Sequence, residues 1–260
     1  MPTPTPAPHP HRWYLLPVLC LSVFLVVVDN TIVNVALPSF ARNLHASDAS
    51  LQWIVDAYSL AFAGLLLAGG GIGDRFGRKR TMQVALVCFG SFSALAAFAD
   101  STGSLIVARA LMGAAAAFVF PTGLAILTSI FPDHTERAKA IGIWSATTGI
   151  AVALGPITGG LLIEHFWAGS IFLVNVPIVL VTVVLGGLFL PESSARTGHR
   201  FDVRGLVVGT AGVASLVYAI IEGPTWGWAT PETIGLLLGS LAVLGAFAVL
   251  ELRTPGPLLD

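Results

Sequence analysis

Eight blocks of apolar residues, each about as long as a bilayer is thick, constrain the fold of this chain more than any other feature. The blocks cover residues 13–40, 51–71, 82–99, 104–130, 138–163, 169–190, 203–221 and 233–250. A helix needs about 20 apolar residues to cross the hydrocarbon core of a membrane. Only 10% of the 260 residues are charged, whereas a soluble domain usually has about 25%. The sequence therefore predicts an all-α polytopic membrane protein.

Lysine and arginine are distributed unequally between the two sets of loops that join these blocks. One set, together with the amino-terminal tail, holds nearly all of the 13 Lys and Arg residues. The other set holds only Arg42, and Arg109 lies inside a block. Loops rich in Lys and Arg remain on the cytoplasmic side of a membrane. We therefore expect a multi-pass protein of the plasma membrane with both termini of this chain in the cytoplasm.

The densest group of charges lies at the junction of the second and third blocks, in the loop GGIGDRFGRKR at residues 70–80. Cations hold the turn of a membrane hairpin on the cytoplasmic side, and glycines let the two helix ends approach. The pattern resembles the signature loop of the major facilitator superfamily at Gly70, Asp74, Arg75, Gly77, Arg78 and Lys79. That resemblance implies a latch that closes a cytoplasmic gate through contacts between two bundles. The alternative is a topology anchor without moving parts.

Asp29 lies deep inside the first block, beside Asn30, Thr31 and Asn34. An ionised Asp at the centre of a bilayer costs roughly 2.5–3.5 kcal/mol on insertion scales, so such a group faces a cavity, a partner or a proton. The alternative is a shorter helix with Asp29 near its outer end. The sequence DNTIVNVALP at residues 29–38 resembles the first-helix signature of the fourteen-helix drug:proton antiporters in that superfamily. The resemblance implies that Asp29, with Asn30 and Asn34, belongs to a proton or substrate-cation site.

Arg109 is the one cation inside a block, in the sequence LIVARALMGAAAA at residues 105–117. Arginine stays charged in proteins, so it needs an anionic or carbonyl partner in the interior of the bundle. The segment resembles the fourth-helix signature of the family, whose arginine is linked to proton coupling, although Met112 replaces a common glutamine. We expect Asp29 and Arg109 to face a shared, water-filled crevice. A purely structural arginine that anchors helix ends is the alternative.

The fifth block contains GIAVALGPITGG at residues 149–160. Pro156 removes a backbone hydrogen bond and bends a helix, and Gly155, Gly159 and Gly160 thin its surface so that another helix can pack there. The segment resembles the antiporter signature of proton-driven exporters, with Ala151 where that signature often has glycine.

The resemblance also divides the chain into segments and implies a missing half. We expect a proline-rich, disordered cytoplasmic tail (1–12), a six-helix bundle of the major facilitator type (13–190), a cytoplasmic linker (191–202), two additional spans (203–250) and the start of a second linker (251–260). A fourteen-helix transporter needs a second six-helix bundle. We expect it either as a carboxy-terminal bundle or as a partner chain.

These features predict proton-coupled export of hydrophobic drugs or antibiotics, with the proton as coupling ion and no cofactor. Two alternatives remain open, namely a non-transporting membrane module or half-transporter subunit, and a solute importer of the same superfamily. The formal net charge of −1 implies no nucleic-acid partner. Cys20 and Cys88 are too few for a disulfide framework or a metal site. The blocks contain no nucleophile–base arrangement, so we expect no enzyme and no catalytic residues.

Overall fold

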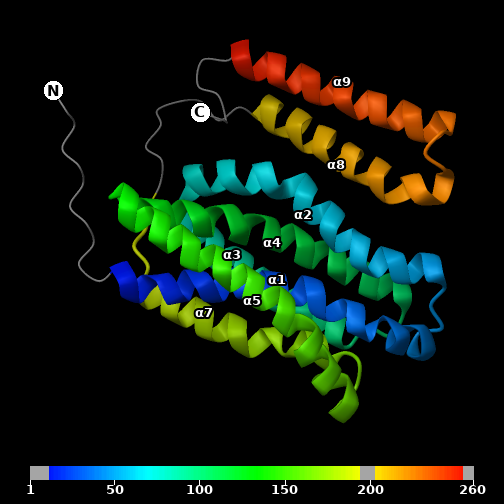
Figure 1. Cartoon of the computed structure of the whole chain (residues 1–260), viewed down its shortest axis with the longest axis horizontal. Coiled ribbons are helices and arrows are strands. Elements are labelled where there is room, and N and C mark those ends of the chain that lie inside the picture. The colour runs from blue at the N-terminus through cyan, green and yellow to red at the C-terminus, as the bar shows by residue number, and fades with distance from the viewer. Residues whose placement is uncertain (1–11, 194–202, 254–260) are drawn as a thin grey trace.

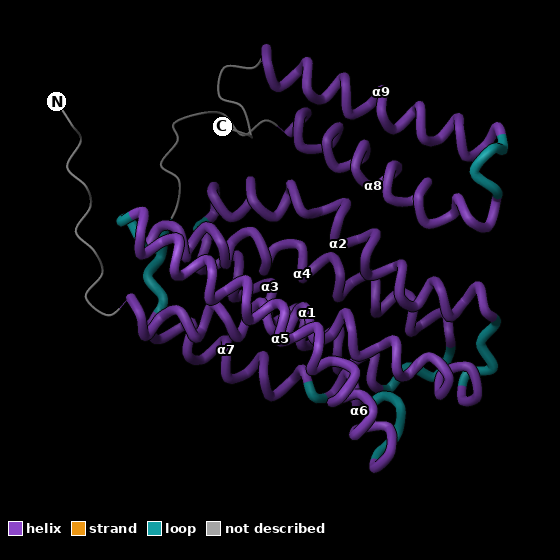
Figure 2. The backbone as a smooth tube through the Cα atoms, in the orientation of Figure 1, coloured by secondary structure: helices purple, strands orange, loops and turns teal. Residues whose placement is uncertain are grey.

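The computed structural model describes residues 12–193 and 203–253, and every regular element in these ranges is an α-helix (Figures 1 and 2). The elements are α1 (Arg12–Asn43), α2 (Asp48–Phe76), α3 (Arg78–Ala97), α4 (Thr102–Ile130), α5 (His134–His165), α6 (Ser170–Leu173), α7 (Asn175–Phe189), α8 (Val203–Trp226) and α9 (Pro231–Arg253). With α6 and α7 taken together, the described residues contain 8 helices long and apolar enough to cross a membrane. The predicted all-α polytopic fold is confirmed.

Helices α1 to α7 form one bundle, and α8 and α9 form a hairpin that packs along α2 (Figure 1). Trp53 of α2 lies beside Tyr218 of α8, with ring centroids 6.1 Å apart. Most of the expected tail (1–12), of the linker (191–202) and of the last segment (251–260) lies outside the described residues.

Small residues set the spacing between α2 and α4. A Cβ atom added at Gly113 would overlap the backbone carbonyl of Tyr58, and one added at Gly69 would overlap the carbonyl of Ala117. Lipid provides no hydrophobic drive for helix association, so close backbone approach through small residues supplies much of the attraction between spans. This close packing brings α2 and α4 together around the charged residue that α4 carries.

The structure corrects the predicted loop at residues 70–80. α2 continues to Phe76 and α3 begins at Arg78, so only Gly77 separates the two helices. Gly77 has a φ of 103°, a conformation that glycine adopts readily and other residues rarely. Charges and glycines favour a loop, but a helix longer than the hydrocarbon core carries its polar end into the headgroup region. That is why the helices extend through most of this segment.

The sixth span is interrupted at Val174, between α6 and α7. Pro177 explains the interruption, because it has no N–H to donate to the carbonyl of Leu173, four residues earlier. A proline is tolerated in the first turn of a helix, and Pro177 occupies that place in α7. The interruption makes Asn175 the first residue of α7, in the middle of the bundle.

Candidate functional site

An ion pair between α1 and α4 lies at the centre of the bundle. Nη1 of Arg109 is 2.6 Å from Oδ2 of Asp29, and both side chains are 0% exposed. Nε of Arg109 donates to the carbonyl of Ile54 on α2, at 3.1 Å. The guanidinium carbon lies 4.3 Å from the ring centroid of Tyr58, within the range of a cation–π interaction. Tyr58 is fixed in turn by its hydroxyl, which donates to the carbonyl of Val26 at 3.2 Å.

Asn175 holds the second oxygen of the carboxylate. Its Nδ2 atom donates to Oδ1 of Asp29 at 2.7 Å and to the hydroxyl of Ser93 at 3.0 Å. The Ser93 hydroxyl donates to the carbonyl of Phe172 at 2.8 Å. Both oxygens of Asp29 therefore have a partner, and one polar network joins α1, α3, α4 and α7.

The network is satisfied only in part. Among the described residues, Nη2 of Arg109 and Oδ1 of Asn175 are buried without a hydrogen-bond partner. Breaking a buried ion pair by removing one partner costs about 3–5 kcal/mol, because the remaining charge is left uncompensated. The opposite charges of Asp29 and Arg109 therefore stabilise this arrangement of the four helices.

The expectation of a water-filled crevice is wrong for this structure. Asp29 and Arg109 face each other, as expected, but side chains of four spans enclose both of them. In the described part of the chain no hydrogen bond joins Asn30 or Asn34 to Asp29 or Arg109, and their place in a proton or substrate-cation site stays a prediction. Asn34 is exposed and donates to the carbonyls of Asn30 and Thr31 on its own helix. Asn30 is one residue and Asn34 five residues after Asp29 on α1. At these spacings the asparagines lie on other faces of the helix than Asp29.

Three members of the network were missed as site residues by sequence reasoning. Asn175 was not among the predicted site residues, although a polar amide inside an apolar span needs a buried partner. Tyr58 and Ser93 give no comparable signal, since tyrosine and serine are common in membrane helices. Asp56, another acid of the second apolar block, is partly exposed on α2.

The glycine and proline residues of the fifth span lie in a continuous helix. α5 extends through Pro156 as one uninterrupted helix. Gly160 has no neighbouring atom within 4 Å of an added Cβ in the described part of the chain. Within the described residues Gly160 therefore seats no helix, and a contact of Gly160 with a second bundle stays a prediction.

Gly155 and Gly159 do seat a neighbouring helix, and that helix is α1. A Cβ atom at Gly155 would overlap Oγ1 of Thr31, and one at Gly159 would lie 2.9 Å from Cγ1 of Ile32 and 3.2 Å from its carbonyl oxygen. Thr31 and Ile32 lie two and three residues after Asp29 in the chain. The glycines of α5 therefore determine how closely α5 approaches the segment of α1 that carries the buried acid.

The charges of residues 70–80, which we call the basic hairpin, make contacts inside the same bundle. Nε of Arg78 lies 2.7 Å from Oδ1 of Asp74, and its Nη1 donates to the carbonyl of Ala125 on α4 at 3.2 Å. Nζ of Lys79 donates to the carbonyl of Gly187 on α7 at 2.8 Å. The guanidinium carbon of Arg75 lies 5.4 Å from the ring centroid of Phe76.

Glu192 joins the end of the sixth span to the basic hairpin, a role that sequence reasoning missed. Its carboxylate accepts the backbone N–H groups of Lys79 and Arg80, at 3.0 and 3.2 Å. These donors lie in the first turn of α3, where backbone N–H groups have no partner inside the helix. Gly70 makes a looser contact, since an added Cβ would lie 4.0 Å from Cβ of Pro121. The contacts to a second bundle that a latch requires stay a prediction.

We expect Gly77→Ala to destabilise the basic hairpin. The φ of 103° is unfavourable for alanine, and its Cβ would lie 2.8 Å from a carboxylate oxygen of Glu192. Backbone strain of this kind costs about 1–3 kcal/mol. Thermal unfolding of the purified protein in detergent should show the loss. Gly187→Ala is the control, because nothing described lies within 4 Å of its added Cβ; equal melting temperatures for both variants would contradict the prediction.

The fold and the enclosed pair define a class of protein, the multi-pass helical-bundle membrane proteins with an acid–arginine pair between two spans. Within that class, the chain belongs to the Major Facilitator Superfamily, because the sequence profile of this family matches residues 19–255. The family predicted from the hairpin and helix motifs is confirmed.

Three of the proteins similar to this chain are named for resistance or efflux. The chain is 42% identical over 251 residues to a puromycin resistance protein of Streptomyces alboniger. This alignment covers 95% of this chain and 49% of that protein. It is 36% identical over 258 residues to a tetracenomycin C resistance and export protein of Streptomyces glaucescens. This alignment covers 99% of this chain and 48% of that protein. It is 39% identical over 252 residues to the multidrug efflux pump LfrA of Mycolicibacterium smegmatis. This alignment covers 95% of this chain and 49% of that protein. The chain spans about half the length of these relatives.

Solved structures share the fold at low sequence identity. A crystal structure of a peptide transporter, POT, superposes with a TM-score of 0.67 at 16% identity and covers 92% of this chain and 52% of that chain. The human organic anion transporter MFSD10 gives a TM-score of 0.61 at 16% identity, covering 80% and 55%. Both likenesses support the bundle architecture.

Proposed function

We propose that this chain supplies the amino-terminal half of a proton-coupled exporter of hydrophobic drugs or antibiotics. In this proposal residues 13–190 are the amino-terminal bundle, 203–250 are two additional helices, and 251–260 begin the linker to a second bundle. The names of the relatives support export of such compounds. The observation that carries the proton-coupling part is the ion pair of Asp29 and Arg109, enclosed at 0% exposure.

The enclosed pair supplies a mechanism for coupling. When a proton neutralises Asp29, Arg109 loses its anionic partner and keeps, among the described residues, the carbonyl of Ile54 and the rings of Tyr58 and Phe172. An uncompensated buried charge disfavours the enclosed arrangement by about 3–5 kcal/mol. The protein then shifts toward an access state in which water or other groups reach Arg109. A ligand or proton drives a conformational cycle only through such differences in free energy between states.

The movement would pass from α1 to α5 through their close contact. Gly155 and Gly159 pack against Thr31 and Ile32, so a displacement of the Asp29 segment cannot leave α5 in place. In transporters of this type the substrate site lies near the midplane between two bundles. We propose that Asn30 and Asn34, which lie outside the ion-pair network, contribute to this half of the substrate site.

We further propose a plasma-membrane location with the basic hairpin on the cytoplasmic side. The start of α1, the hairpin, the start of α5 and the end of α7 lie at one end of the bundle (Figure 1). This end carries Arg12, Arg75, Arg78, Lys79, Arg80, Arg137 and Lys139, whereas Arg42 lies near the other. Under the positive-inside rule the first end is cytoplasmic, where the hairpin would act as the gate.

Reconstitution into vesicles tests the proposal. The complete transporter that contains this chain should move a hydrophobic antibiotic such as puromycin against its gradient when a pH gradient is imposed, and should stop when the pH gradient is collapsed. Binding without flux would instead support a non-transporting module or subunit. Flux only in the uptake direction would support an importer of the same superfamily. Either of these results would overturn the proposal.

A further inference from the structure

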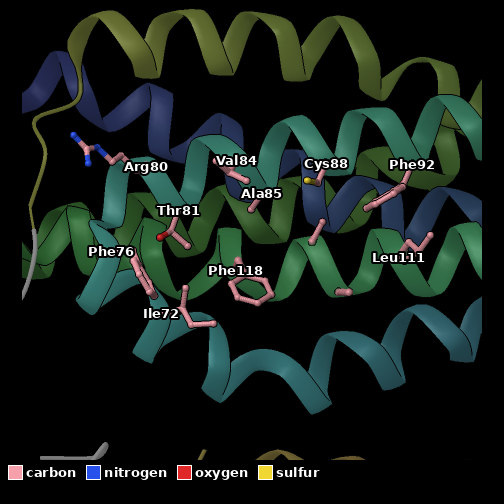
Figure 3. A pocket seen from close by; sticks show the side chains of 12 residues that line it. Ile72, Phe76, Arg80, Thr81, Val84, Ala85, Cys88, Phe92, Leu111 and Phe118 are labelled. Atoms are coloured by element: carbon pink, nitrogen blue, oxygen red, sulfur yellow. The ribbon is translucent and has the colours of Figure 1, made fainter. Parts of the chain in front are cut away.

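An apolar groove runs between α2, α3 and α4 (Figure 3), and neither residue of the ion pair lines it. Its volume is about 560 Å³. It is open on one side, since Val84 and Leu111 in its walls are 64% and 39% exposed. Ala85 and Cys88 form part of its floor, and Phe118 closes it on the side of α4. The apolar lining is of the kind that hydrocarbon can contact.

The length of the groove matches one leaflet of a bilayer. Its walls on α3 extend from Arg80 at one end to Phe92 at the other (Figure 3). At 1.5 Å per residue this distance is about 18 Å. The hydrocarbon core of a bilayer is about 30 Å thick, so one leaflet spans roughly 15 Å. A single acyl chain can therefore lie along the whole groove with its headgroup beside Arg80.

The end of the groove that reaches the headgroups is positively charged. The Arg80 side chain is 81% exposed, and Lys79 precedes it in the first turn of α3. One acid is close: Nε of Arg80 is 3.7 Å from Oε2 of Glu192. That carboxylate already accepts two backbone N–H groups of α3.

We propose that this groove binds one acyl chain of an anionic phospholipid, whose phosphate contacts Arg80 at the end of the basic hairpin. The apolar walls select hydrocarbon, and the cations select the headgroup. Because the bound lipid would touch α2, α3 and the Gly77 junction, it would stabilise the basic hairpin. This lipid site is separate from the buried ion pair and does not depend on transport.

Native mass spectrometry of the 260-residue chain in detergent tests the site with two probes of identical acyl chains, phosphatidylglycerol and phosphatidylcholine. A cation near a membrane surface contributes about 1 kcal/mol to binding of anionic lipid, which corresponds to roughly fivefold in affinity. We expect preferential retention of one phosphatidylglycerol. Arg80→Gln should reduce that retention about fivefold and leave phosphatidylcholine unchanged. Equal retention of the two lipids by the unmodified chain would overturn the proposal.

Two further variants locate the site. Cys88→Phe fills the groove and should abolish retention of the lipid, whereas Val87→Phe, on the neighbouring 50% exposed position outside the groove, should not. In a Cys20→Ser background, phosphatidylglycerol should also slow alkylation of the Cys88 thiol. The helical circular dichroism signal of each variant should match that of the unmodified chain, as a control for folding. Unchanged retention in Cys88→Phe, or a dimer of the chain in place of a lipid adduct, would show that lipid does not occupy the groove.

Discussion

Replacing Arg109 with leucine should lower the free energy of unfolding by about 3–5 kcal/mol, the typical loss when one partner of a buried ion pair is removed. Asp29 would be left at 0% exposure with only the amide of Asn175 as a partner. The measurement is denaturant-induced unfolding in mixed micelles, followed by the helical circular dichroism signal. Arg109→Lys should be intermediate, because a point charge cannot replace a planar fork that reaches both Asp29 and the carbonyl of Ile54.

A double variant separates the ion pair from simple loss of side-chain volume. In Arg109→Leu combined with Asp29→Asn no charge remains in the core, so the double variant should be more stable than Arg109→Leu alone. The non-additivity is the coupling energy of the pair. If Arg109→Leu unfolds like the unmodified protein, or if the two changes add without coupling, the pair does not stabilise the bundle.

The second large effect is expected at Gly155. An alanine there would place its Cβ on Oγ1 of Thr31, so α5 and α1 must separate. Overpacking of a close contact costs about 1–3 kcal/mol, and the displaced segment of α1 carries Asp29. We therefore expect Gly155→Ala to lower both the melting temperature and the transport rate of the complete transporter.

Gly160 provides the matched control on the same helix. Nothing described lies within 4 Å of an added Cβ at this position. Alanine is favoured over glycine inside a helix by about 1 kcal/mol, so Gly160→Ala should be neutral or slightly stabilising. Equal losses in the Gly155 and Gly160 variants would mean that flexibility of the helix, and not its contact with α1, explains the glycines.

The spans were predictable because a membrane helix is specified mainly by the length of its apolar run. The ends of the helices were not predictable in the same way. The polar last turn of α2 and first turn of α3 continue past the hydrocarbon core of the membrane and meet at Gly77. The break at Val174 also escaped prediction, although Pro177 was visible in the sequence. Its effect depends on whether the helix bends or restarts, which packing decides.

The sequence identified the two charged residues of the site, but it did not predict the contacts that they make. Asp29 and Arg109 were identified because a charge inside a span is costly. Their direct contact joins residues 80 positions apart and depends on how α1 and α4 pack. Asn175 completes the network from 146 positions away, and no local pattern indicates that distance. Helical periodicity could have shown that Asn30 and Asn34 lie on other faces than Asp29.

We propose that protonation of Asp29 couples the proton gradient to transport, and the Asp29→Asn variant removes this protonation. Asparagine has the shape and neutral charge of the protonated acid. In vesicles of the complete transporter, this variant should retain exchange of substrate across the membrane but lose uphill transport driven by a pH gradient. Asp56→Asn, at the partly exposed acid of α2, should retain both. Undiminished uphill transport in Asp29→Asn would contradict the account.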